Sequence, residues 1–196
     1  MVVGAGRAAR ALTLGLAGSR VRLEPFGPAN QAEVEGLTAV RETVPVMGGP
    51  TRIASTVSPW APPMLIRDTA SGRALGTVES GELSGYEGVA VLVLWLDTAR
   101  SRPGQGLEAY AIYVTQLFEQ GARLVHVEVL DFNNQVLRLL RRVSAEPQAR
   151  LRRHAYVAGR FWDLLVFAFD ADEWRRHLAP FLVHLRGAGA AAGESD

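Results

Sequence analysis

Two residue types that carry much of protein chemistry are missing from this sequence. It contains no cysteine, which excludes disulfides, thiolate zinc sites and cysteine nucleophiles. It also contains no lysine, so a Schiff-base lysine and the lysine of a Walker A phosphate loop are excluded. Long hydrophobic runs are absent too, because no segment reaches the roughly twenty apolar residues of a membrane span. We therefore expect a cytoplasmic protein that has no membrane partner.

The chain also has little net charge. Its 21 basic and 20 acidic residues leave a formal charge of +1, which provides no broad surface for nucleic acid and confines any basic site to a local patch. We therefore expect no nucleic-acid partner. Of its 196 residues, 48% are hydrophobic, which is enough to bury one core. We expect a single domain over residues 20–186, an N-terminal extension over 1–19 and a disordered tail over 187–196.

Hydrophobic periodicity predicts a mixed α/β fold. Strands are predicted at 20–26, 64–68, 74–80, 89–97, 123–131, 151–157 and 163–169, and helices at 30–44, 107–120, 133–143 and 172–186. The order is a run of antiparallel strands followed by a β-loop-α-β unit, rather than a regular series of parallel strands and helices. The expected fold class is therefore α+β with a mostly antiparallel central sheet.

The first glycine motif opens the chain as VVGAGRAA. Gly4, Gly6 and Ala9 are spaced as in a dinucleotide-binding fingerprint, and the acid Glu24 follows about twenty residues later. Such a fingerprint requires a full strand before its glycines, and only three residues precede Gly4. A dinucleotide-binding protein that uses Gly4 and Gly6 is therefore an alternative and not the leading hypothesis.

The second glycine motif has the better context. The buried strand VLVLWLD leads into SRPGQG and then into a helix, whose first amides have no intrahelical acceptor and favour an anion. Gly104 and Gly106 leave room for a phosphate group, and Arg100 and Arg102 flank them. The motif predicts a pyrophosphate site, although an ordinary strand-to-helix turn has the same composition.

The ordered series of segments resembles the GCN5-related N-acetyltransferase (GNAT) family, and within it the branch of ribosomal-protein N-terminal acetyltransferases. SRPGQGLEA resembles the CoA loop of that branch, and VEVLDFN its next strand and asparagine. The segment 142–169, RVSAEPQARLRRHAYVAGRFWDLLVFAF, resembles its closing hairpin, and VRLEPFGPAN its first strand. The resemblance covers roughly residues 20–176. It implies a GNAT-like fold, acetyl-CoA as acyl donor, a primary amine as acceptor, and direct attack without a covalent enzyme intermediate. We also expect no bound metal.

The resemblance also implies which residues contact the cofactor. The acyl carbonyl is expected at the backbone of the central strand, and the pyrophosphate at the loop. The implied contacts are Leu94, Trp95, Leu96, Arg100, Ser101, Arg102, Gly104, Gln105, Gly106, Leu107 and Asn133. Asn133 is also in position to cap the following helix, and the two roles are compatible.

Candidate catalytic and acceptor residues lie on the strands. Glu128 is the candidate base, and Tyr156 could donate a proton to the leaving thiolate where relatives use a tyrosine at the position of Leu140. Glu79 and Glu82 could bind a cationic amine such as a protein N-terminus, an amino sugar or a small amine metabolite. Trp60 could cover the acceptor site. Each of these residues also has a structural interpretation, as an exposed strand charge or a packing residue.

Some positions depart from the family pattern, and they support a second hypothesis. They are Ser101, Pro103, Val136 and the pair Ser144-Ala145. A GNAT-like domain that has lost turnover and serves as a binding or assembly module would tolerate such changes. His177 and His184 share a face of the predicted last helix and are interpreted as structural or interfacial, so this helix and the late hairpin are candidates for a homodimer contact.

Overall fold

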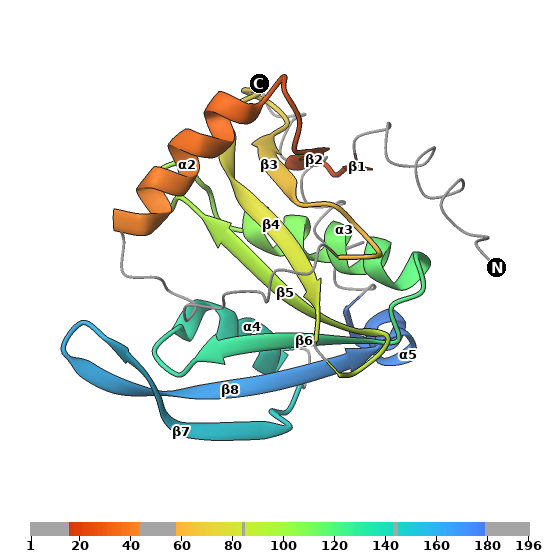
Figure 1. Ribbon diagram of the computed structural model, residues 1–196, viewed down its shortest axis with the longest axis vertical. Coiled ribbons are helices and arrows are strands. Elements are labelled where there is room, and N and C mark those ends of the chain that lie inside the picture. Colours follow the sequence, from red (N-terminus) through yellow and green to blue (C-terminus); the bar gives the residue numbers. More distant parts are fainter. Residues whose placement is uncertain (1–15, 44–57, 84, 143–144, 179–196) are drawn as a thin grey trace, which may run out of the picture.

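The computed structural model describes residues 16–43, 58–83, 85–142 and 145–178. They form one 8-stranded sheet in the order β1-β2-β3-β4-β5-β6-β8-β7 (Figure 1). The strands are β1 (Leu16–Ala17), β2 (Val21–Pro25), β3 (Met64–Asp68), β4 (Ala74–Glu82), β5 (Val89–Leu96), β6 (Leu124–Leu130), β7 (Ala149–Val157) and β8 (Arg160–Asp170). The helices are α2 (Gln31–Thr43), α3 (Gln105–Glu119), α4 (Asn134–Arg142), α5 (Ala171–Glu173) and the π-helical turn η1 (Trp174–Leu178).

Helices cover both faces of the sheet. Leu37 of α2 packs with Leu65 and Trp95 on one face, which we call the α2 face. Helices α3 and α4 pack against the other face in the main core, where Tyr113 is fully buried. We call this second face the α3 face. In Figure 1, α3 crosses behind β4 and β5. The predicted mixed fold with a mostly antiparallel sheet is confirmed.

The sheet has a single parallel contact among its described strands, between β5 and β6. Its ladder pairs Val89–Leu92 with Leu124–Val127, after which β5 continues to Leu96 and β6 to Leu130. The connection through α3 explains the parallel direction, because a strand-helix-strand unit returns the second strand in the same sense. The carboxyl-terminal residues of β5 and β6 are therefore not paired with each other, which leaves a gap at the centre of the sheet. We call this gap the sheet opening.

Two short elements lie near the ends of the described chain. β1, which falls within the predicted extension 1–19, pairs with β2. The predicted helix 172–186 begins as the short α5, where the Asp170 carboxylate accepts hydrogen bonds from the amides of Asp172 and Glu173, and it continues as η1. Gly4, Gly6, Ser144, His184 and the tail 187–196 lie outside the described residues. In the described part of the chain, no helix is long and apolar enough to span a membrane.

Candidate functional site

The loop between β5 and α3 uses its first amides internally. The amides of Arg100 and Ser101 both donate to the Asp97 carbonyl, each at a distance of 3.0 Å. The Arg100 guanidinium pairs with the Asp97 carboxylate at 2.7 Å. The Arg102 amide donates to Oε1 of Gln105 at 2.7 Å. These bonds fix the loop before it reaches the helix. Arg102 is exposed and Ser101 is half-buried.

The N-terminus of α3 is open to an anion. Gly104 precedes the helix with φ 90°, a left-handed conformation that favours glycine, and no side chain caps the helix there. Helix geometry leaves the amides of Gly106 and Leu107 without intrahelical acceptors. A Cβ on Gly106 would lie 2.6 Å from Cδ1 of Leu96, so glycine allows the helix to approach the end of β5. Free amides and the helix dipole together suit a phosphate group.

Arg20 also lies at this loop, and sequence reasoning missed it. Its guanidinium donates to the Pro103 carbonyl at 3.4 Å and occupies the space that a Cβ on Gly104 would need. The only signal in the sequence was a basic residue at the start of a predicted strand, 83 positions before the loop. The cation nevertheless adds positive charge beside the helix N-terminus.

Two buried polar side chains of α3 hold the loop in place. Gln105 donates from Nε2 to the Asp68 carboxylate at 2.6 Å, so its side chain points into the protein. The Glu108 carboxylate accepts from the amides of Ser19 and Arg20 at 2.6 and 3.0 Å. Gln105 was expected as a cofactor contact, and the structure instead uses its side chain to support the loop.

The unpaired end of β5 presents two backbone amides. The Asp97 amide donates to the Leu75 carbonyl, which fixes the alternation of the β4–β5 ladder. By that alternation Trp95 exchanges hydrogen bonds with Thr77, whereas the amides of Leu94 and Leu96 point away from β4. They point to the side where the β5–β6 ladder has ended. Leu94 and Leu96 therefore offer donors at the sheet opening, and the Trp95 amide does not.

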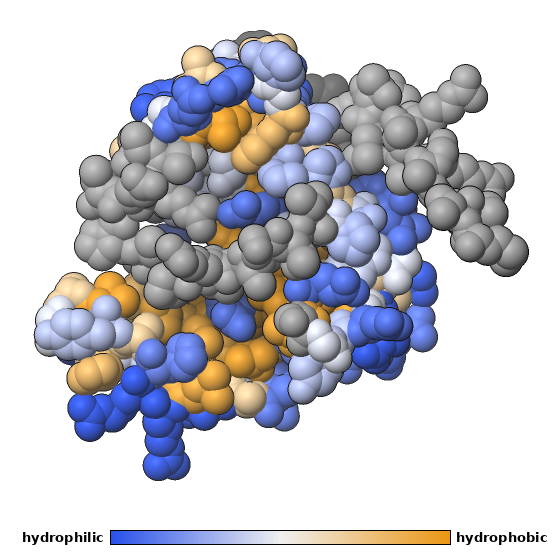
Figure 2. All heavy atoms as spheres, viewed as in Figure 1, coloured by the Kyte–Doolittle hydropathy of each residue, from blue (hydrophilic) through white to orange (hydrophobic). Residues whose placement is uncertain are grey.

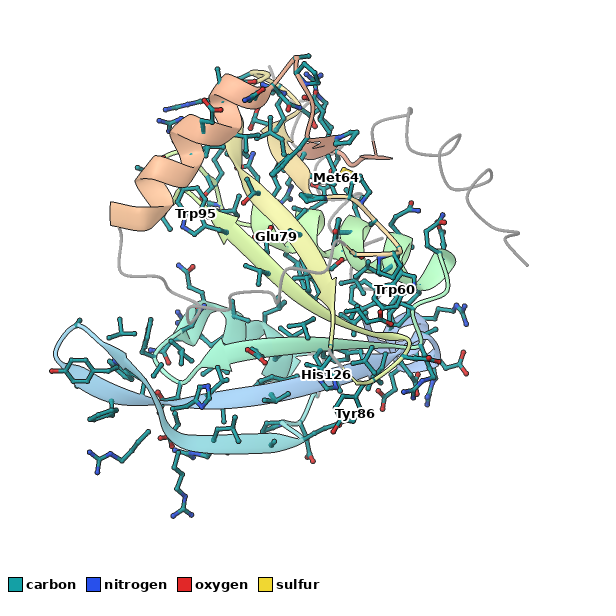
Figure 3. All side chains as sticks on the ribbon, in the orientation of Figure 1. Trp60, Met64, Glu79, Tyr86, Trp95 and His126 are labelled. Carbon is teal, nitrogen blue, oxygen red and sulfur yellow. The ribbon has the colours of Figure 1, made fainter. Side chains whose placement is uncertain are left out.

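Glu128 is the first β6 residue beyond the parallel ladder. Glu128 lies on the α2 face, as Glu79 does. Glu79 of β4 pairs with Val93 of β5, and Glu128 directly follows Val127, which pairs with Leu92 of β5. Val93 therefore lies between the two glutamates in one row across the sheet. Two strand spacings separate these carboxylates by about 10 Å at the backbone. Figure 3 labels Glu79 and Trp95 on the central strands and His126 on β6.

His126 lies on the same side of β6 as Glu128. Its imidazole is half-buried, and burial lowers its pKa below the usual 6.5, while the negative charge of Glu128 acts in the opposite direction. The imidazole is therefore neutral at pH 7 and adds no positive charge to the row of carboxylates. The α2 face at the opening is acidic and suits a cationic amine.

The structure does not bring every predicted acceptor residue to this face. Glu82 points to the α3 face, and its carboxylate accepts from the Gly88 amide at 3.2 Å, which stabilises the β4–β5 turn. Trp60 is half-buried against the main core (Figure 3). Tyr156 is 65% exposed near the turn of the β7–β8 hairpin. Its partner Phe161 lies on the part of β8 that extends beyond the pairing with β6. Of the predicted acceptor residues on β4, only Glu79 lies on the same face of the sheet as Glu128.

Two polar residues follow the end of β6. Oδ1 of Asn133 accepts from the Val136 amide at 3.3 Å, so Asn133 caps α4. Oδ1 of Asp131 is buried and has no hydrogen-bond partner among the described residues. Sequence reasoning missed Asp131, whose only signal was an acid at the end of a buried strand. Its free acceptor suits an N–H group of a ligand that enters the opening.

Within the described residues, no three His, Asp or Glu side chains lie close enough together to bind a metal ion. Leu140, which stands where relatives carry a tyrosine, is 4% exposed and packs in the main core.

The fold matches solved acetyltransferase structures over most of the chain. A GCN5-related N-acetyltransferase from Brucella melitensis aligns with a TM-score of 0.62 and 21% identity, over 89% of this chain and 84% of that one. RimJ of Mycobacterium smegmatis, in complex with CoA-disulfide, aligns at 0.63 and 20%, over 87% and 91%. Ribosomal-protein-S5-alanine acetyltransferase from Vibrio fischeri aligns at 0.65 and 11%, over 82% and 98%. No family model matches the sequence, and no curated protein matches it.

Proposed function

We propose that this chain, which has the fold of the GCN5-related N-acetyltransferases, transfers an acetyl or related acyl group from CoA to a primary amine. One observation carries the proposal. The β5–β6 ladder ends at Leu92 and Val127, so that free backbone donors and a carboxylate flank the same opening. The anion site at the N-terminus of α3 lies beside that opening, next to Leu96.

The two faces of the sheet suit the two substrates. The donor would enter on the α3 face, with its pyrophosphate at the amides of Gly106 and Leu107 and the cations of Arg20 and Arg102 nearby. The thioester would pass between β5 and β6, where the amides of Leu94 and Leu96 can bind the carbonyl oxygen. The acceptor would approach from the acidic α2 face. RimJ, which has this fold at 20% identity, is described in complex with CoA-disulfide, and this supports CoA as the donor.

The chemistry follows from this placement. The neutral amine nitrogen attacks the thioester carbon, a C–N bond forms, and the C–S bond breaks when the tetrahedral oxyanion collapses. Glu128 takes a proton from the amine directly or through water, and the thiolate leaves and takes a proton from solvent. Glu79 and Glu128 give the acceptor site its preference for a cation. The acceptor class is a protein N-terminus, an amino sugar or a small amine, and the Vibrio fischeri protein of this fold is named for an alanine of ribosomal protein S5.

Calorimetric titration with acetyl-CoA tests the donor site, with NAD and FAD as controls. We expect micromolar binding of acetyl-CoA and none of either dinucleotide. Gly106→Val should weaken binding at least tenfold, because its side chain displaces the helix from Leu96. Binding of NAD in place of acetyl-CoA would contradict the proposal and favour the first glycine motif.

Release of free CoA with a panel of amines tests the reaction. Glu128→Gln should lower kcat by about 100-fold with little change in acetyl-CoA affinity, as expected for loss of a general base. Glu87→Gln, at an exposed position in the β4–β5 turn, is the matched control. Acetyl-CoA binding without turnover of any amine would instead favour a binding or assembly module.

A further inference from the structure

The β7–β8 hairpin projects beyond the rest of the sheet. β6 pairs with β8 only from Leu130 opposite Leu164 onward, whereas β7 and β8 remain paired as far as Val157 and Arg160 (Figure 1). Leu130 and Leu164 anchor one side of the hairpin in a small core with Ala155. The residues nearer the turn lie outside the opening described above, and the proposed acyl transfer does not use them.

Two exposed aromatic rings lie opposite each other on this hairpin. Tyr156 is 65% exposed and Phe161 is 51% exposed, they form a cross-strand pair, and their ring centroids are 5.0 Å apart. The Arg153 guanidinium lies 4.7 Å from the centre of the Phe161 ring. Large rings left in solvent together with a stacked cation are typical of a binding surface.

Arginine dominates the charge of the hairpin. Between Ala149 and Asp163 the sequence has four arginines and one acid, and that acid is already engaged. The Asp163 carboxylate pairs with the Arg150 guanidinium at 2.6 Å and accepts from the Arg153 amide at 2.8 Å. Among the described residues, no carboxylate forms an ion pair with Arg152, Arg153 or Arg160. Figure 2 shows hydrophilic and hydrophobic side chains interspersed over this part of the surface.

A cavity of about 370 Å³ opens at the base of the hairpin, between α4 and β8. Its walls are mainly apolar, and Arg141 and Arg150 contribute cations. By strand alternation, Phe161 lies on the same face of β8 as Leu165 and Phe167, which line the cavity. The apolar members of the lining are Leu137, Leu140, Ala145, Pro147, Leu165 and Phe167. Exposed rings, arginines and an apolar hollow of this size therefore occupy one continuous face.

We propose that this face, which we call the hairpin patch (Tyr156, Phe161, Arg141, Arg152, Arg153 and the adjoining cavity), binds single-stranded nucleic acid. Arg160 is not part of it, because its guanidinium lies 3.2 Å from the centre of the Trp162 ring on the opposite face of the hairpin. Bases stack on the two rings and enter the cavity, and the arginines bind phosphates, which is the combination that single-stranded nucleic acid requires. The small net charge of the chain leads us to expect no nucleic-acid partner, but the hairpin concentrates its cations locally, and a local patch is enough for a short single strand.

An acidic peptide is the other anionic partner to consider, and the edge of β7 argues against it. A peptide that extends the sheet needs a regular edge strand. The β7 ladder shifts register between Leu151 and Ala155, and Arg153 has φ 51°, so the edge is interrupted in its middle. The same interruption and the clustered positive charge oppose pairing with a second copy of the hairpin.

Fluorescence anisotropy of the full chain tests the proposal, with a labelled twelve-nucleotide oligo(A) as RNA and as DNA. We expect micromolar binding at 50 mM salt and roughly 20-fold weaker binding at 200 mM, since three phosphates are contacted. Tighter binding of RNA would indicate contacts to the 2′-hydroxyl, and equal binding would indicate stacking and phosphate contacts alone. Both results support the proposal.

Matched variants locate the site. Phe161→Leu keeps an apolar side chain on the hairpin and should weaken binding about tenfold through loss of stacking. Its control is Tyr86→Leu, another exposed ring, which is 62% accessible and lies in the β4–β5 turn. Arg152→Ser should reduce the salt dependence by about 0.7 in log-log slope, and Arg73→Ser, which is also exposed, should not.

Acetyl-CoA affinity and circular dichroism report whether each variant is folded. The proposal is wrong if neither oligonucleotide binds at 50 mM salt, or if Phe161→Leu and Arg152→Ser bind as well as the unmodified chain. Tighter binding of a polyglutamate peptide than of both oligonucleotides would also overturn it. These results are independent of acyl transfer, so failure here leaves the proposed function unaffected.

Discussion

The side chain of Gln105 joins Asp68 of β3 to the loop that precedes α3. Nε2 of Gln105 lies 2.6 Å from Oδ2 of Asp68, and Oε1 accepts from the Arg102 amide at 2.7 Å. Both side chains are buried, at 2% and 6% exposure. The shape of the loop therefore depends on a carboxylate from a strand that does not border the sheet opening.

Replacing Gln105 by Leu should destabilise the protein and weaken acetyl-CoA binding. The change leaves a buried carboxylate oxygen and the Arg102 amide without their partner, which costs about 1–3 kcal/mol in the free energy of unfolding. Urea denaturation measures the loss, and calorimetry measures the affinity. Gln31→Leu, at an exposed position in α2, is the control. Equal stability of the two variants would show that the Asp68–Gln105 contact does not hold the loop.

Asp68 should make stability depend on pH in the acid range. The backbone amide of Ser71 is the main cause that holds its pKa below the usual 3.8, and bonds from the Ser71 hydroxyl and Gln105 act in the same direction. A depressed carboxyl pKa gives stability that is present above 3.8 and is lost as the pH falls through the folded-state value. Asp68→Asn should therefore show a smaller loss of unfolding free energy between about pH 5 and pH 2 than the unmodified chain. Identical pH profiles would contradict this.

Glu108 should be a stabilising residue although it is an acid in the core. Its carboxylate accepts two backbone amides and, at 3.1 Å, the Ser19 hydroxyl, and it is 3% exposed. Glu108→Gln turns one acceptor into a donor that faces other donors, so we expect a loss of about 1–3 kcal/mol. Glu119→Gln, at an exposed position near the end of the same helix, should change stability by less than about 0.5 kcal/mol. Thermal or urea unfolding separates the two.

Two glycine-to-alanine changes should have opposite effects. Gly104 has φ 90°, and a Cβ there would overlap the Arg20 guanidinium, so Gly104→Ala should cost about 1–2 kcal/mol. Gly36 lies on the exposed side of α2 with no atom within 4 Å of an added Cβ, so Gly36→Ala should raise stability by about 0.5–1 kcal/mol. Unfolding curves measured on both variants should shift in opposite directions.

The imidazole of His126 should report on Glu128. Burial lowers the pKa of His126 below 6.5, and the Glu128 carboxylate partly offsets that effect. In an NMR titration the His126 resonance should have a midpoint below 6.5, and Glu128→Gln should lower it further. Since the folded form resists protonation, the contribution of His126 to stability falls as the pH drops below 6.5. A midpoint that Glu128→Gln leaves unchanged would show that the two side chains do not interact.

Much of the architecture could be predicted because local patterns specify it. The run VAVLVLWL is apolar at successive positions, as expected for a strand covered on both faces, and it is β5. The glycines that follow it begin a helix, as predicted, although α3 starts at Gln105 and not at Leu107. Patterns of period 2 and 3.6 fix such elements without knowledge of their neighbours.

Features that depend on distant partners could not be predicted. In the sequence, Glu108 is indistinguishable from an ordinary acid in the first turn of a helix. Its hydrogen-bond partners Ser19 and Arg20 lie 89 and 88 residues away, so no local pattern indicates its buried position. β1 is two residues long and carries too little sequence to show periodicity. The sequence predicts a strand over 74–80 with Glu82 just after it, which allows Glu79 and Glu82 to share one acceptor site. Since β4 continues to Glu82, the odd spacing places the two carboxylates on opposite faces.

The short β5–β6 ladder also joins two groups of strands that are otherwise separate in the sheet. β2 to β5 form a series of antiparallel neighbours, and β6, β8 and β7 form a second antiparallel group. Four paired residues on each strand then join the halves across the length of α3. Among the described strands this ladder is the only backbone pairing between the two groups, so its loss would separate them. A donor bound across it would hold the two halves together and slow unfolding.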